Sequence, residues 1–370
     1  MEKEPGRPVT LTDFFQENMA QLDHWDYDDS SFTHTDMTPG SALLSDFREV
    51  NSVRELSSWK KRGEQGPMEK MYFVDGKMRV YGRILLGMDV LLLAEITAGH
   101  VLWEKGRGLS MGFSPHHPPL RERVLGASER AALSLQTSVQ DPALCIGEGW
   151  SFTLATSGRT PPGPGAVEAS QQALFTAMQK LEKKVVSQLI AKNTPVIQDG
   201  IVHGSDPTFR PGVGPCGLVK RIENLRLSRD ETSLAEETVA LSRSLYALLF
   251  ELEAGERTPF LSASFEAGSH LARVFTYTRL IRKDPYHPLK GLIRLEIVVP
   301  EETDSLREEI TLFFDRMVAL LPTLTADYPW RRLPENLFPI IALEDFLGQF
   351  FLPPDLVKCS FERAIHPRRR

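Results

Sequence analysis

The sequence predicts a mixed α/β protein in which helices flank a sheet that contains an antiparallel strand meander. Strand-like apolar runs follow one another through short connections in residues 70–104. Helical periodicity then appears at about 170–192 and 234–253, with a strand-like run at 195–202 between the two segments. A further strand pair precedes a third amphipathic segment that ends near residue 320. Strands that alternate with helices in this way are typical of a mixed sheet with helices packed on it.

Composition limits the class of function. The chain has 370 residues, 41% hydrophobic and 25% charged, which suits a globular protein of one large domain or two ordinary ones. Its net charge of -6 gives no global positive field toward DNA or an anionic membrane. Contact with nucleic acid would therefore come from a partner or from local basic clusters, each of which has the alternative of an ordinary solvated face. The clusters are Lys60–Lys61–Arg62, Lys183–Lys184, Lys220–Arg221, Arg279–Arg282–Lys283 and Arg368–Arg370.

Cysteine usage and hydropathy predict a cytoplasmic protein without a membrane segment. Cys145, Cys216 and Cys359 are odd in number and far apart, and no C-x-x-C pair occurs, so neither a disulfide framework nor a zinc site is expected. The first ten residues, MEKEPGRPVT, lack the apolar core of a signal peptide. The most apolar stretch, residues 84–103, contains two acidic residues and a Gly-Met-Asp break. It predicts two strands and a turn rather than a membrane span.

Changes of composition along the chain predict three parts. Residues 1–65 are polar and acidic and are expected to form an N-terminal arm with a peripheral helix. Residues 66–355 contain the strands and helices described above and are expected to form the main domain. Residues 356–370 are expected to form a basic C-terminal tail.

Individual elements carry more specific expectations. Residues 70–104 read as three strands, KMYFVDG, MRVYGRILL and VLLLAEITAGHVLWE, with an Asp-Gly turn after the first. Ser170 is predicted to be the N-cap of the first long helix. Arg294 and Glu296 alternate with apolar residues, which predicts the solvent face of a half-buried strand.

Two Asp-Gly pairs stand where apolar runs end, FVDG at 73–76 and IQDG at 197–200. Each pair would place an aspartate, Asp75 or Asp199, at the rim of the sheet rather than in its core. Asp-Gly is also a common turn pair, so each aspartate has the alternative of a turn residue that bonds its own backbone.

Glu182 lies within an apolar seam of the predicted first long helix. Phe175, Glu182 and Leu189 are spaced by seven, and Met178 and Val186 flank the glutamate at four residues on either side. A carboxylate in such a seam faces a desolvation penalty unless a positive charge compensates it, and a bound divalent cation would do so. The alternative is that Glu182 lies at the edge of the stripe and reaches water.

The three carboxylates together predict a metal site. Asp75, Glu182 and Asp199 would offer hard oxygen ligands at one rim of the sheet, which suits Mg²⁺ or Mn²⁺ and not zinc. Two such ions bridged by carboxylates can activate water and stabilise the leaving oxygen in phosphodiester hydrolysis.

These motifs resemble a known family. An acid on the first strand of an antiparallel meander looks like an RNase H-like nuclease, and the finer pattern resembles the NurA nucleases, partners of the HerA hexameric DNA translocase. Asp75 matches the first acid and Glu182 the helical glutamate, and Asp199 belongs to a second Asp-Gly seventeen residues beyond that glutamate. Gly217-Leu218-Val219-Lys220 matches a later G-x-V-K strand.

The resemblance covers residues 70–350 and is strongest in 171–222 and 273–298. It implies an RNase H-like mixed sheet and a manganese-dependent (or magnesium-dependent) deoxyribonuclease, exo- or endonucleolytic, that acts on DNA ends and single strands. It also implies a homodimer docked on a HerA-type hexameric ATPase in DNA end resection or phage defence. On the same resemblance, Lys220 could meet the scissile phosphate as a point charge, with a surface lysine at a strand end as the alternative.

The chain departs from the family pattern near its C-terminus. The family shows Tyr-Pro and then a His eight residues after the Tyr, whereas LFPIIALEDFLGQF at 337–350 has Phe338 in place of the Tyr and no His. Glu344 or Asp345 could supply an oxygen ligand instead, or could simply begin a helix.

The departure supports a second hypothesis, in which the protein is a catalytically weakened or inactive NurA-like subunit that serves as a docking partner of the translocase. A third reading, an RNase H-like nuclease acting on RNA or RNA–DNA hybrids, finds no recognisable RNA-binding module in the sequence.

Overall fold

The computed structural model describes residues 9–18, 20–23, 42–44, 56, 58–64, 66, 68–87, 89–147, 149–157, 166–202, 208–220, 227–228, 235–264, 270–300, 306–326 and 336–366. Most of the predicted N-terminal arm, the basic residues Arg368–Arg370 and Arg221 lie outside the described residues.

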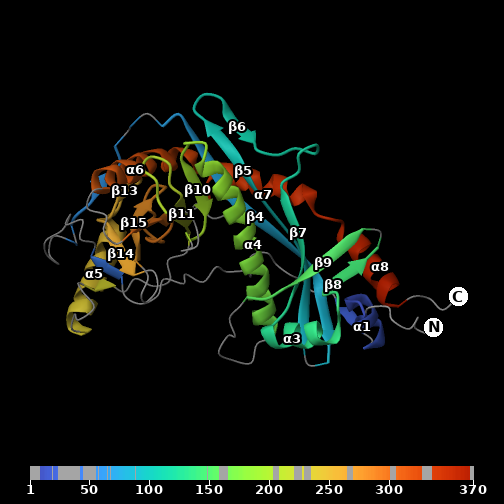
Figure 1. The fold of residues 1–370 in the computed structure, drawn as a ribbon. Coiled ribbons are helices and arrows are strands. Elements are labelled where there is room, and N and C mark those ends of the chain that lie inside the picture. Colours follow the sequence, from blue (N-terminus) through green and yellow to red (C-terminus); the bar gives the residue numbers. More distant parts are fainter. Residues whose placement is uncertain are drawn as a thin grey trace.

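One mixed sheet of sixteen strands organises the described part of the chain (Figure 1). In chain order the strands are β1 (Gln21–Asp23), β2 (Ala42–Leu44), β3 (Lys61–Arg62), β4 (Lys70–Leu86), β5 (Asp89–Glu104), β6 (Gly108–Met111), β7 (Leu120–Gly126), β8 (Ala143–Ile146), β9 (Trp150–Ala155), β10 (Val196–Asp199), β11 (Cys216–Val219), β12 (Leu227–Ser228), β13 (Glu256–Arg257), β14 (Leu261–Ser264), β15 (Leu271–Arg279) and β16 (Leu292–Pro300).

Their spatial order is β12-β2-β14-β15-β16-β11-β10-β4-β5-β7-β9-β8, with β1 beside β4, β6 beside β5, and β13 beside β15 and β3. The pairs β4–β10, β10–β11, β7–β9 and β2–β12 are parallel and the others antiparallel. The structure therefore confirms the predicted α/β class, a mixed sheet with flanking helices.

The helices are α1 (Leu11–Glu17), α3 (Glu129–Ser138), α4 (Ala166–Ile190), α5 (Ala235–Glu251), α6 (Arg307–Leu320), α7 (Phe338–Leu347) and α8 (Pro354–Ile365), with short 3-10 turns η3 (Leu321–Leu324) and η4 (Gly348–Phe350). No helix among these is long and apolar enough to cross a bilayer. The predicted N-cap at Ser170 is wrong, because α4 begins one turn earlier and the Ser170 hydroxyl donates to the Val90 carbonyl at 2.7 Å.

The predicted turn at Asp75–Gly76 is also wrong. β4 continues through both residues and pairs with β5 from Lys70 to Leu86, apart from a bulge between Val80 and Gly82. The meander thus begins with two long strands instead of three short ones. The reversal comes after Leu86, which confirms that the apolar stretch 84–103 contains two strands and a turn.

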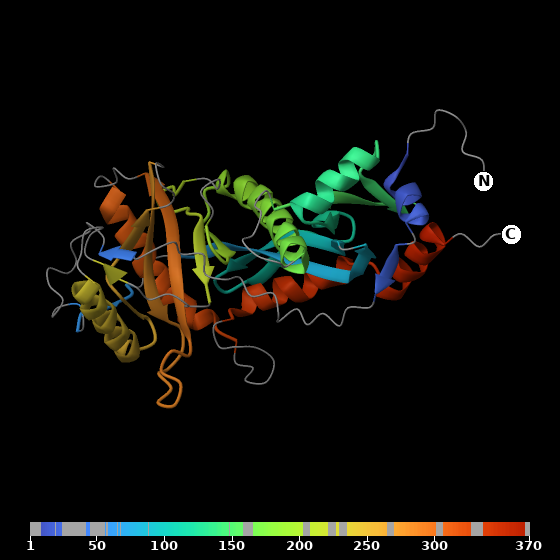
Figure 2. The same cartoon turned by 90° about the horizontal axis from the view of Figure 1, so that it is seen from below.

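Helices α4 and α7 cover opposite faces of β4 and β5, as Figure 2 shows. Alternate residues of β4 join two different cores because side chains alternate along a strand. Val74 packs in the core beneath α4, whereas Phe73 packs with Leu343 and Leu347 of α7. By this alternation Asp75 belongs to the α7 face of β4 and Gly76 to the α4 face.

Two further cores lie toward the ends of the sheet. At one end α1, α3 and α8 pack with β8 and β9, and Gln16 of α1 donates to the Ala364 carbonyl of α8 at 2.6 Å. At the other end α5 packs on β14 and β15 (Figure 1). Helix α8 occupies most of the segment that the sequence suggested as a basic tail, and the three-part division of the chain remains a prediction.

The predicted solvent face of β16 is wrong. Arg294 and Glu296 are fully buried and form an ion pair, with Nη2 of the arginine 2.9 Å from Oε2 of the glutamate. The reason is that β16 lies between β15 and β11 and is covered on both faces. The two charges neutralise each other in the interior, so the alternation of charged and apolar residues did not indicate a solvent-exposed face.

Candidate metal centre

Parallel pairing of β10 with β4 brings Asp75 and Asp199 together. The register pairs Ile197 with Phe73 and Gln198 with Val74, and each aspartate is the next residue on its strand. Because neighbouring residues in register point to the same face, both carboxylates lie on the α7 face of the sheet. The parallel strand thus places the second Asp-Gly motif beside the first.

A sharp turn ends β10 immediately after Asp199. Gly200 has φ +88, in the left-handed region that favours glycine, so this second Asp-Gly pair does form the predicted strand end. The side-chain amide of Gln198 donates through Nε2 to the Ile201 backbone carbonyl at 2.6 Å, and this hydrogen bond closes the turn. Asp199 therefore sits at a strand end whose backbone path is fixed by hydrogen bonds.

Buried charges hold the loop beyond this turn. The Glu296 carboxylate accepts from the Val202 amide at 2.8 Å, and the Arg273 guanidinium donates to the Val202 carbonyl at 3.0 Å. Arg273 and Glu296 are themselves paired at 3.4 Å. This network, which the sequence did not suggest, ties the Asp199 loop to β15 and β16.

Glu344 of α7 completes a group of three carboxylates. Oxygen atoms of Asp75, Asp199 and Glu344 all lie within 4.8 Å of one another, a spacing that one metal ion can bridge. Glu344 is partly buried, whereas its neighbour Asp345 is exposed. Of the two acids that the sequence offered in place of the missing histidine, the structure brings Glu344 to the site.

Asp75 is the most buried member of the group, at 6% exposure. Its Oδ1 accepts from the Gly76 amide at 2.7 Å, but its Oδ2 is buried with no hydrogen-bond partner in the described part of the chain. Burial, together with the charges of Asp199 and Glu182, raises the pKa of Asp75 well above its ordinary value, although Lys220 and the Gly76 amide act in the opposite direction. An unpartnered buried carboxylate oxygen beside two other acids is the environment that a hard divalent cation satisfies.

Lys220 supplies positive charge to this group. It directly follows β11, the parallel neighbour of β10, and its Nζ lies 2.5 Å from Oδ2 of Asp199. Both side chains are mostly buried, at 19% and 17% exposure, so the pair is poorly screened by solvent. The structure thus joins three of the four predicted site residues, Asp75, Asp199 and Lys220.

Glu182 approaches from the opposite face of the sheet. It lies on α4, and its Oε1 stands 2.4 Å from the position that a Cβ atom at Gly76 would occupy. Its charge is close enough to raise the pKa of Asp75. Glu182 is nevertheless outside the set whose oxygens lie within 4.8 Å of one another. The predicted fourth residue therefore borders the centre without belonging to its three-carboxylate group.

Lys77 is a second cation near the centre that the sequence did not single out. It lies two residues beyond Asp75 on the same face of β4, and its Nζ is 3.5 Å from where a Cβ at Gly348 would stand. Gly348 follows Glu344 by one helical turn. None of the ion pairs among the described residues includes Lys77, so its ammonium can donate hydrogen bonds to a negatively charged group from outside the protein.

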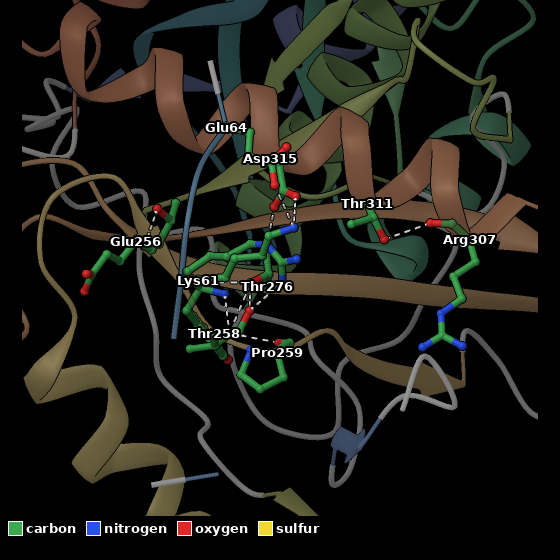
Figure 3. Close-up of polar contacts among 12 residues, drawn as sticks. Lys61, Glu64, Glu256, Thr258, Pro259, Thr276, Arg307, Thr311 and Asp315 are labelled. Atoms are coloured by element: carbon green, nitrogen blue, oxygen red, sulfur yellow. Dashed lines mark hydrogen bonds and ion pairs between the residues drawn. The ribbon is translucent and has the colours of Figure 1, made fainter. Parts of the chain in front are cut away.

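By contrast, cations from three of the predicted basic clusters bind groups of the protein itself. Lys61 binds Asp315 at 2.6 Å (Figure 3), and Lys60 binds Glu256 at 3.2 Å. Arg279 is fully buried, and its guanidinium donates to four backbone carbonyls. Further pairs are Lys184–Glu122 and Lys283–Glu251.

No protein-family model matches the sequence, and no curated protein matches it either. Among solved structures, the chain is similar to the crystal structure of the NurA nuclease from Sulfolobus solfataricus. The TM-score is 0.42 at 11% sequence identity, over 80% of this chain and 84% of that one. A likeness at this level assigns no activity to this chain.

Proposed function

We propose that this protein is a metal-dependent DNA nuclease that hydrolyses phosphodiester bonds of single strands and DNA ends. The observation that carries the proposal is the buried Asp75 carboxylate, which lies beside Asp199 and Glu344 and whose Oδ2 has no hydrogen-bond partner among the described residues. Three carboxylates in so small a volume repel one another, and a divalent cation removes that repulsion.

Asp75, Asp199 and Glu344 would hold Mn²⁺ or Mg²⁺, because oxygen-only ligand sets suit these hard ions. Glu182, next to Gly76, would add its negative charge to the same centre from the α4 face of the sheet. When bound, such an ion polarises the scissile phosphate and lowers the pKa of a coordinated water.

The two nearby lysines have separate tasks in this proposal. Lys220 would place its ammonium against the scissile phosphate, because Asp199 already holds it at the carboxylate group. Lys77 would bind an adjacent phosphate of the strand, because its ammonium is unpaired within the described residues and lies toward η4.

The DNA substrate, the homodimer and the HerA-type hexameric ATPase are proposed on the sequence resemblance. The charge balance agrees with dependence on a partner. A chain of net charge -6, with cations of three basic clusters paired internally, would bind DNA weakly by itself. A ring-shaped partner would thread the strand into the site, in DNA end resection or phage defence.

Cleavage of single-stranded DNA with Mn²⁺ and the translocase present tests the proposal. We expect Asp75→Asn, Asp199→Asn and Glu344→Gln each to abolish cleavage while the circular dichroism spectrum stays native. Asp345→Asn is the matched control, because this acid is exposed on the same helix, and it should cleave as the wild type does. A wild-type protein that neither binds Mn²⁺ nor cleaves DNA would refute the proposal.

A second candidate function is a catalytically weakened or inactive subunit that docks on the translocase. Phe338, which begins α7 where the family has a tyrosine, and the absence of a histidine in that helix favour it. The two candidates differ in one measurement. A wild-type protein that binds Mn²⁺ and the translocase but cleaves no DNA supports the docking subunit, whereas Mn²⁺-dependent turnover supports the nuclease.

A further inference from the structure

We propose that Glu95 of β5 is a positioning residue that sets the place of Glu344 in the metal centre, by anchoring the segment that follows α7. The inference rests on the proposed function, because it assumes that Glu344 is a metal ligand. Neither the three-carboxylate group nor the family resemblance includes Glu95.

Glu95 is a fully buried carboxylate with a complete set of donors. Its Oε2 accepts from the Tyr81 hydroxyl at 2.5 Å and from the Leu352 backbone amide at 2.9 Å. Its Oε1 lies 3.3 Å from Nε of both Arg121 and Arg123 on β7. A buried charge with four partners is costly to disturb, so the Leu352 amide is firmly held.

Other groups on the same face of the sheet hold the residues next to Leu352. Arg121 Nη1 donates to the Phe350 carbonyl at 2.8 Å, and Arg79 Nη1 donates to the Leu352 carbonyl at 3.5 Å. The Arg79 guanidinium also stacks over the Phe351 ring at 4.9 Å from its centroid. Three consecutive residues are thus fastened to β4, β5 and β7 by side chains clustered around Glu95.

A bulge in β4 makes the Tyr81 contact possible. The register with β5 shifts between Val80 and Gly82, so Tyr81 is the extra residue on the bulged strand. Burial and the Glu95 carboxylate both raise the pKa of Tyr81, so its hydroxyl stays protonated and donates. The bulge therefore aims a donor at Glu95 that a regular strand would place differently.

The anchored segment is continuous with the helix that carries Glu344. Helical structure runs from Phe338 through η4 to Phe350, six residues beyond Glu344. Midway, Leu347 packs against Gly99, the residue that pairs with Asp75 across β4 and β5. A short rigid helix fixed at its C-terminal end and resting on the sheet has little freedom to slide, so its anchor determines how far Glu344 lies from Asp75.

The competing role for Glu95 is purely structural, the attachment of α8. A double-mutant cycle on the Mn²⁺ dissociation constant, measured by isothermal titration calorimetry, separates the two roles. Tyr81→Phe removes one donor to Glu95 and keeps the ring, and Glu95→Gln serves as a second variant. We expect Tyr81→Phe to weaken Mn²⁺ binding about tenfold, the lower end for loss of an outer-shell partner. In a Glu344→Gln background the same change should have no further effect.

Gln16→Ala is the matched control, because it loosens α8 at Ala364 without touching residues 350–352, and its Mn²⁺ affinity should equal that of the wild type. The role of Glu95 would be overturned if Tyr81→Phe lowered Mn²⁺ affinity equally with and without Glu344. It would also be overturned if neither Tyr81→Phe nor Glu95→Gln lowered Mn²⁺ affinity. These results leave the proposed nuclease intact. Failure of the wild type to bind Mn²⁺ would instead remove the metal centre itself, and the inference with it.

Discussion

A Cβ atom at Gly76 would stand 2.4 Å from Oε1 of Glu182 and 2.8 Å from Cγ of Met178. Strand β4 and helix α4 therefore meet at a separation that leaves no room for a side chain. The Glu182 charge helps to raise the pKa of Asp75, which lies on the other face of the same strand. The glycine serves the approach of a helix to a strand and not the reversal of the chain.

Gly76→Ala should consequently displace the Glu182 carboxylate and lower the free energy of unfolding by about 1–3 kcal/mol, the usual cost of overpacking. Urea denaturation of the metal-free protein measures it. In a Glu182→Ala background the cost should be smaller, because the nearest atom is then gone. An equal cost in both backgrounds would assign the clash to Met178 instead.

The raised pKa of Asp75 predicts a pH dependence of stability. Between the ordinary aspartate pKa of about 3.9 and the raised value, the folded chain binds a proton at Asp75 that the unfolded chain has released. The free energy of unfolding therefore falls as pH rises through this window. Asp75→Asn should remove that fall and stabilise the metal-free protein above the window, as measured by chemical denaturation from about pH 4 to about pH 7.

The same group predicts the pH dependence of metal binding. Mn²⁺ requires the ionised carboxylate, so the affinity of the wild type should rise with pH across the window, with release of a proton. Calorimetry in buffers of different ionisation enthalpy counts that proton. A wild-type affinity that is constant across the window would contradict the assignment of Asp75 as a ligand.

Sequence spacing predicted one site from Asp75, Glu182 and Asp199, but it could not predict how these residues are arranged. That Asp75 and Asp199 meet depends on β10 entering the sheet parallel to β4, between β4 and β11, which local patterns do not encode. Glu344 comes from a helix far along the chain, and nothing in its own segment distinguished it from Asp345. Only packing of α7 on the sheet selects between these two acids.

The errors of the strand assignment have a common cause. Asp-Gly at 75–76 has the chemistry of a turn, and only the proximity of Met178 and Glu182 explains why glycine lies inside a strand. Alternation of Arg294 and Glu296 with apolar residues predicts a solvent-exposed face of the strand. That face is buried instead, and burial is possible because the two charges form an ion pair with each other. Local propensity was overridden by tertiary contact in both places.

Arg279 provides a test of the distinction between structural and DNA-binding cations. Its buried guanidinium donates to the carbonyls of Leu249 and Leu252 and to those of Pro288 and Lys290, at 2.5–2.8 Å. Arg279→Met leaves these acceptors without their donor and should lower the free energy of unfolding by more than about 3 kcal/mol. Exposed Arg282→Met is the control and should change it by less than about 0.5 kcal/mol. Similar stability of both variants in urea titrations would contradict this structural role.

Lys77 should affect DNA affinity rather than stability. If it meets one phosphate, Lys77→Met reduces the slope of log K against log salt for single-stranded DNA by about 0.7. Fluorescence anisotropy over a salt series, with Ca²⁺ in place of the reactive ion, gives this slope. Lys180→Met removes an exposed lysine from α4 and should leave the slope as it is. Identical slopes for Lys77→Met and the wild type would exclude the phosphate contact.

Substitutions of Lys220 and Asp199 should have different effects on turnover and on Mn²⁺ affinity. The Lys220 ammonium competes with a cation for Oδ2 of Asp199, from which it lies 2.5 Å away. Lys220→Met should therefore bind Mn²⁺ at least as tightly as the wild type, yet lose about 10²-fold or more in kcat, because charge at the scissile phosphate is missing. Asp199→Asn should lose both affinity and turnover. Lys220→Arg should recover only part of the rate, since a planar guanidinium does not replace a compact ammonium. Weaker Mn²⁺ binding by Lys220→Met in calorimetry would show that the lysine organises the carboxylates instead of competing with the ion.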